Sequence, residues 1–241
     1  MKQIFFLWSL AFSLGGLGAL PPFLVPLLET PSFQKGVVPY SYPLETDLIA
    51  LFSSTYTRHA HKFWKPKNEA LAKVLQTNAV AGAADAELIE LVYRDLVENA
   101  VAKEQNAPQF DPKGDLGFCF GRALWVHHLL RKKQITQADI AKLFVVGKLN
   151  YRDLMWDFHV ATLVRGKDKT WWAIDSLYEK PLPAAEWMTR AEKLGANKKR
   201  PELFFALTDP RKFQAGHGSY QVEALKNSSL YGYFQGLFGK F

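Results

Sequence analysis

Three side chains in the 241-residue sequence could act as a nucleophile, a base and an orienting acid. Cys119 is the only cysteine and lies between Gly117 and Gly121. His159 and Asp175 follow it, in the segments WDFHVA and WWAID. A thiolate can attack a carbonyl carbon, an imidazole can take the thiol proton, and a carboxylate can fix the imidazole tautomer. The order Cys119, His159, Asp175 therefore predicts acyl transfer through a thioester.

The turn before Cys119 predicts that its thiol lies at the start of a helix. Unpaired N–H groups and a partial positive charge at a helix N-terminus favour the thiolate, and these N–H groups could also face an oxyanion. A lone cysteine is otherwise often a small buried hydrophobe. The downstream histidine and aspartate favour the interpretation as a nucleophile.

The elements that must position these residues divide into helices followed by strands. Periodicity predicts helices over 68–78, 85–104, 119–132 and 183–194, and short strands over 143–149, 158–164, 170–174 and 203–207. Gly166 to Lys169 predicts a hairpin turn. This order indicates an α+β fold, with a nucleophile-bearing helix packed on an antiparallel sheet. Such an arrangement is similar to papain-like and transglutaminase-like cores.

Composition narrows the classes of partner and cofactor. The net charge is +7, but the basic runs at 131–133 and 198–200 are only triplets and no RNA-binding motif accompanies them. We therefore expect no nucleic-acid partner. His59 and His61 lack a third ligand at a suitable spacing, so the sequence predicts no metal and no other cofactor. One cysteine excludes an internal disulfide.

The N-terminal residues have the order of a secretory signal. Lys2 is followed by an apolar run from Ile4 to Leu14 and then by small residues up to Ala19. We expect residues 1–19 to be a signal peptide and the protein to be secreted or periplasmic; an uncleaved membrane anchor is the alternative. Residues 20–110 would form an arm and a helical region that could be a removable pro-region. Residues 111–241 would form the catalytic domain.

A series of short segments resembles the bacterial protein-glutaminases, which are secreted protein-glutamine deamidases with a Cys-His-Asp triad. The matching pieces are CFxRA from Cys119, VGKL at 146–149, WxxHVAxLV at 156–164 and IDxL at 174–177, with Pro181 and Trp187 beyond. Ser176 departs from the family, which tends to have proline there. The known secreted enzymes also have more cysteines.

The resemblance implies roles for the three residues. Cys119 would be the nucleophile, His159 the base and Asp175 the orienter. The reaction would be hydrolysis of glutamine to glutamate with release of ammonia. Substrates would be proteins or peptides with accessible glutamine. After cleavage of its signal peptide, the protein itself would not associate stably with a membrane.

The triad alone leaves alternatives open. A transglutaminase uses an amine in place of water as the acyl acceptor, and a cysteine protease cuts the backbone instead of the side-chain amide. A non-catalytic exported binding protein with the same fold is a further alternative.

Overall fold

The computed structural model describes residues 42, 44, 46–55, 60–77, 80–110, 118–152, 154–196, 202–216 and 231–238. The helices are α2 (Leu48–Thr55), α3 (Ala60–Gln76), α4 (Ala86–Glu98), α5 (Cys119–Lys132), α6 (Ala184–Glu192) and α8 (Tyr231–Phe238). The strands are β1 (Ile140–Tyr151), β2 (Leu154–Arg165), β3 (Trp171–Ile174), β4 (Leu182–Pro183) and β5 (Phe204–Thr208). Short 3₁₀ helices are η1 (Glu104–Gln109) and η2 (Gln137–Asp139).

The strands form one antiparallel sheet in the order β4-β3-β2-β1-β5. Its centre is the long β1–β2 hairpin, in which Val145 pairs with His159. Helices α2 to α5 precede the first strand, so the predicted α+β class with an antiparallel sheet is confirmed. Pairing between β1 and β2 continues out to Tyr151 and Leu154, which is why both strands are longer than the predicted ones.

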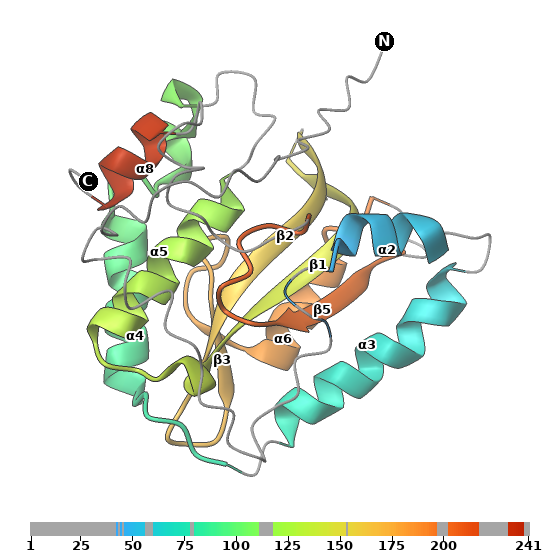
Figure 1. Ribbon diagram of the computed structural model, residues 1–241, viewed down its shortest axis with the longest axis horizontal. Coiled ribbons are helices and arrows are strands. Elements are labelled where there is room, and N and C mark those ends of the chain that lie inside the picture. The colour runs from blue at the N-terminus through green and yellow to red at the C-terminus, as the bar shows by residue number, and fades with distance from the viewer. Residues whose placement is uncertain are drawn as a thin grey trace, which may run out of the picture.

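Both faces of the sheet are covered (Figure 1). Because side chains alternate along a strand, Phe144 and Val146 belong to one apolar cluster and Leu143 and Val145 to the other. The first cluster includes buried residues of α2, α4, α5 and α8, and the second includes those of α6 and the end of α3. The sheet is therefore the middle layer, which explains the nearly continuous apolar character of β1.

Helix α5 is attached to the sheet through both apolar and polar contacts. Its buried residues Ala123, Val126 and Leu130 lie in the first cluster. The Thr162 Oγ1 of β2 donates a 2.6 Å hydrogen bond to the Ala123 carbonyl. The expected packing of the nucleophile-bearing helix on the sheet is thus observed.

The helices before α5 also contact this core. Asp85 caps α4, and its side chain accepts a hydrogen bond from the Leu88 N–H. The side chain of Asn68 on α3 donates to the Leu203 carbonyl and accepts from the Phe205 N–H, so it holds α3 against the end of β5. The predicted signal peptide lies outside the described residues. No helix in the described ranges has the length and apolarity to cross a membrane.

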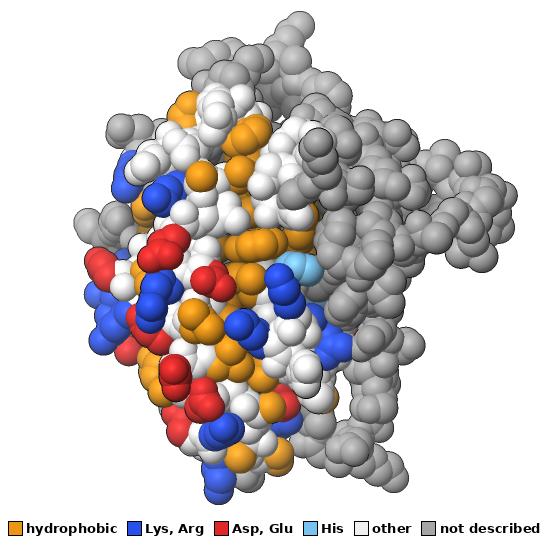
Figure 2. Space-filling model, turned by 90° about the vertical axis from the view of Figure 1, so that its left-hand side faces the viewer, with side chains coloured by type: hydrophobic (Ala, Val, Ile, Leu, Met, Phe, Trp, Pro, Cys, Tyr) orange, Lys and Arg blue, Asp and Glu red, His pale blue; other side chains and the backbone are white. Residues whose placement is uncertain are grey.

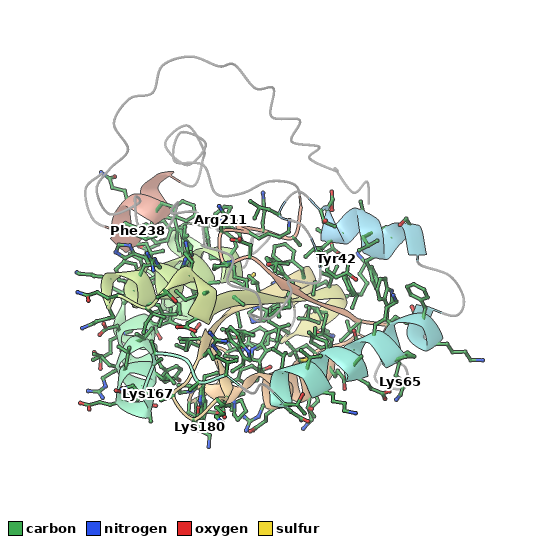
Figure 3. The ribbon with its side chains drawn as sticks, turned by 60° about the horizontal axis from the view of Figure 1, so that its bottom comes forward. Tyr42, Lys65, Lys167, Lys180, Arg211 and Phe238 are labelled. Carbon is green, nitrogen blue, oxygen red and sulfur yellow. The ribbon has the colours of Figure 1, made fainter. Side chains whose placement is uncertain are left out.

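Helix α8 was not expected from the sequence. It lies beside α5 (Figures 1 and 3), where the Phe238 ring contacts Trp125 with centroids 5.4 Å apart. Figure 2 shows the side of the molecule that is at the left in Figure 1. Acidic and basic side chains are interspersed on its described surface. The positive net charge is therefore not concentrated in one patch there.

Candidate active site

Cys119 is the first residue of α5, as predicted. Phe118 precedes it in the left-handed region, with φ of 50°, and its carbonyl accepts from the N–H groups of Gly121 and Arg122 at 3.1 Å. The N–H groups of the first residues of a helix have no carbonyl of that helix to bond. The Cys119 thiol therefore lies where unpaired donors and the helix dipole favour negative charge.

His159 and Asp175 are brought together by the register of β2 and β3. Thr162 pairs with Ile174, so Asp175 comes just past the end of β3 and alongside the preceding part of β2. The His159 Nε2 lies 2.7 Å from the Asp175 Oδ2. This distance falls within the hydrogen-bonding range expected of a base and its orienting carboxylate.

The imidazole of His159 stacks with two indole rings. Its centroid is 5.8 Å from that of Trp156 and 5.9 Å from that of Trp187, and each pair of planes meets at 23°. Two stacked rings leave the imidazole few orientations. Aromatic packing and the carboxylate together therefore fix the ring.

The Asp175 carboxylate is held by three donors. Oδ2 accepts from the Trp187 Nε1 at 2.8 Å as well as contacting His159, and Oδ1 accepts from the Leu177 N–H at 3.1 Å. In the sequence, Trp187 is marked only by the family resemblance. Its hydrogen bond to Asp175 spans twelve residues and has no local sequence signal.

Both members of the pair have shifted pKa values. Burial by itself lowers the pKa of His159, but the charge and hydrogen bond of Asp175, with a contribution from Cys119, outweigh it and raise the pKa to about 9. Burial raises the pKa of Asp175, but His159, Trp187 and Leu177 outweigh it and hold the pKa below its ordinary value. The pair is therefore imidazolium and carboxylate near neutral pH.

The sulfur of Cys119 is a further polar neighbour of the imidazole. A hydrogen-bonding interaction with Cys119 helps to raise the pKa of His159, although Nδ1 makes no bond of ordinary geometry. Catalytic hydrogen bonds are often long or poorly aligned before substrate binds. The structure thus brings all three sequence-predicted residues together. All three are buried, with Cys119 and Asp175 each 5% exposed and His159 fully buried.

Two charged residues near the triad differ in burial, since Asp157 is exposed and Lys142 is buried. Asp157, two residues before His159 on β2, pairs with Lys148 at the surface. Lys142, which sequence reasoning did not single out, is fully buried, and its Nζ donates to the Lys212 carbonyl at 2.7 Å. Burial lowers the pKa of Lys142 to about 7, partly offset by Asp209 and Cys119.

Comparison with known families agrees with this site. A family model described as glutaminase matches residues 93–191, a span that contains α5, the strands β1 to β4 and all three candidate residues. The resemblance to protein-glutaminases is confirmed over this span, and it supports glutamine deamidation by an amidohydrolase in general. Searches of curated proteins and of solved structures found no match to the chain.

Proposed function

We propose that the protein hydrolyses the side-chain amide of glutamine in proteins or peptides, through a thioester on Cys119. The observation that carries this proposal is the buried His159–Asp175 pair, 2.7 Å apart, next to a cysteine at the start of a helix. The glutaminase family match over the same residues supports glutamine as the group attacked.

In the first half of the reaction, the Cys119 thiolate attacks the carboxamide carbon. A bond forms between sulfur and carbon, and the carbonyl electron pair moves onto oxygen. When the oxyanion collapses, the carbon–nitrogen bond breaks and ammonia leaves with a proton from the His159 imidazolium. The products of this half are a thioester and a neutral imidazole.

In the second half, His159 takes a proton from water as the water attacks the thioester carbon. The new oxyanion collapses with loss of the Cys119 thiolate, which leaves the imidazolium on His159. The carboxylic acid that forms releases its proton to solvent and becomes glutamate. Asp175 stabilises this imidazolium and holds the tautomer, so that Nδ1 faces the sulfur. The indole rings of Trp156 and Trp187 keep the imidazole plane fixed through both halves.

We also propose export. The order of Lys2, an apolar run and small residues supports a signal peptide over residues 1–19, which would deliver the protein to the periplasm or medium. Exported proteins and peptides with accessible glutamine would then be its substrates. N-terminal sequencing of the recovered protein should begin near residue 19 or 20, and Met1 on a membrane-bound product would contradict export.

The decisive test is ammonia release from a glutamine-containing protein, with free glutamine as the comparison. Cys119→Ser and His159→Ala should each reduce release by about 10³-fold or more, because the nucleophile and base act as a unit. Asp157→Asn is the matched control, since Asp157 is at the surface. Ammonia release by Cys119→Ser at the wild-type rate would contradict the thioester.

The same samples separate the related reactions. A transglutaminase would attach an added primary amine to the substrate, and a protease would shorten its chain. We expect conversion of glutamine to glutamate with neither change.

A further inference from the structure

Arg122, one turn into α5, is a buried cation without a hydrogen-bond or ion-pair partner among the described residues. The residue is 5% exposed, its Nε has no hydrogen bond, and no ion pair or hydrogen bond of the guanidinium is found within the described ranges. Burial of an unpaired charge is strongly unfavourable, so buried arginines normally pair with a carboxylate or another acceptor. An unpaired buried arginine beside a candidate nucleophile suggests that its acceptor arrives with the substrate.

The position of Arg122 on the helix directs it toward Cys119. Residues three apart on an α-helix are neighbours on one face, and long side chains point back toward the helix N-terminus. On this geometry we expect the guanidinium to lie over the turn that begins with Cys119.

A second unpartnered donor comes from the other end of the chain. Tyr233 of α8 stacks on Phe118, with ring centroids 4.0 Å apart and planes at 14°. A Cβ placed on Gly121 would lie 2.5 Å from the Tyr233 Cε1 and 3.0 Å from its hydroxyl, so the phenol lies directly on the first turn of α5. Tyr233 is 1% exposed, and its hydroxyl has no hydrogen-bond partner in the part of the chain that the structure describes.

The electrostatic environment keeps Tyr233 a donor. Burial raises the pKa of its phenol to about 12, although Arg122 partly offsets this shift. The same phenol also interacts with Cys119, which places the three groups in one neighbourhood. Buried hydroxyl and guanidinium groups that lack partners are rare and require an explanation.

We propose that Arg122 and Tyr233 bind the oxygen of the substrate carboxamide and stabilise the oxyanion formed when Cys119 attacks. This inference rests on the proposed function, because the oxyanion exists only if a carbonyl is attacked. A backbone N–H group at the start of α5 supplies one hydrogen-bond donor to that oxygen, and Arg122 and Tyr233 supply the others. Binding of the oxygen would also give the buried guanidinium its missing acceptor.

The test separates oxyanion binding from activation of the thiol. Ammonia release from a glutamine-containing protein passes through the oxyanion, whereas alkylation of Cys119 by iodoacetamide forms no oxyanion. Tyr233→Phe keeps the ring that stacks on Phe118 and removes only the hydroxyl. Arg122→Met removes the cation but keeps much of the apolar stem.

Matched controls make the comparison specific. Tyr42→Phe removes a hydroxyl from a ring that packs on Phe204 of β5, and Arg94→Met removes an exposed cation from α4. Both controls should retain wild-type turnover. Thermal unfolding of each variant shows whether a loss of turnover reflects loss of the fold, and Tyr233→Phe carries the test if Arg122→Met does not fold.

We expect kcat to fall by about 10²-fold or more in Tyr233→Phe and in Arg122→Met, with a much smaller change in the alkylation rate. Wild-type kcat in Tyr233→Phe would overturn the inference, as would an equal fall in turnover and alkylation. If the wild-type protein itself releases no ammonia, the proposed function fails. If it does and the variants match it, only the assignment of Arg122 and Tyr233 fails.

Discussion

The Trp187 Nε1 and the His159 Nε2 contact the same oxygen of Asp175, at 2.8 and 2.7 Å. The indole ring of Trp187 also stacks on the imidazole it helps to orient. One residue of α6 therefore contacts both members of the pair. Helix α6 is thereby part of the site, although it contributes no group to bond making or breaking.

Replacement of Trp187 by Phe should weaken the site without removing it. A phenyl ring can still pack on His159, but the Asp175 carboxylate loses one charge-assisted hydrogen bond, which we expect to lower the free energy of unfolding by about 1–3 kcal/mol. Turnover should fall while alkylation of Cys119 persists. Urea unfolding and ammonia release measure the two effects.

Trp172→Phe is the control for this substitution. The Trp172 Nε1 contacts Asp168 in the β2–β3 turn at 3.3 Å, away from His159, so its loss should leave turnover unchanged. Equal losses of activity in the two variants would argue against a specific role for Trp187.

The activity should decline on the alkaline side near pH 9. The pKa of His159 is raised to about 9, so the imidazolium that protonates the departing ammonia is lost as the pH rises through that value. The stability contributed by the same ion pair is complete below the ordinary histidine pKa and is lost over the same alkaline range. Initial rates of ammonia release at constant ionic strength would show this limb, and rates still rising above pH 10 would contradict it.

Asp175→Asn should shift the alkaline limb to lower pH. The carboxylate charge is the main cause that raises the pKa of His159, and burial, which lowers that pKa, remains after the substitution. The variant should retain more activity than His159→Ala, because Asp175 forms no bond to the substrate. An unchanged pH profile would indicate that Asp175 does not set the charge of His159.

Asn68→Ala should destabilise the protein while sparing the chemistry. Its side chain satisfies a carbonyl and an N–H of the β5 region, and removal leaves both buried groups unpaired at about 1–3 kcal/mol each. We expect a lower melting temperature with nearly normal kcat below the transition. A normal melting temperature would show that α3 is not held by this contact.

The N-terminal arm should reduce access to Cys119. We predict that part of residues 20–67 lies across the approach to Cys119, because these residues belong to the region that could be a removable pro-region. Limited proteolysis followed by the ammonia assay tests it, with a time course of fragment masses. Activation on trimming would support an inhibitory arm, and full activity before trimming would indicate a structural one.

The elements close to the triad could be predicted well from the sequence. Helix α5 has the predicted bounds because Gly117 and the apolar spacing are local signals, and the β2–β3 turn is marked by Gly166. Helix α3 begins eight residues before the prediction, since Pro66 and the lysines around it obscure an amphipathic pattern. Helix α4 ends at Glu98, before the predicted 104.

The supporting residues of the site could not be predicted in the same way. Trp187, Lys142 and Tyr233 reach the neighbourhood of the triad through tertiary packing, and none of them stands at a distinctive spacing from Cys119. Helix α8 is short and rich in aromatic residues, so it has little helical signal before it packs on α5. Contacts between residues far apart in the sequence produce no periodic pattern, so these contacts could not be predicted from the sequence.

Lys212 connects parts of the chain that are far apart in the sequence. Its buried ammonium donates to the carbonyls of Leu44, Thr46 and Gly216, and its own carbonyl accepts from Lys142 on the sheet. A protein with one cysteine cannot form an internal disulfide, and this lysine joins residues 168 positions apart without one. These hydrogen bonds do not depend on redox conditions. Strong reductants that keep Cys119 as a thiol should therefore leave the fold intact.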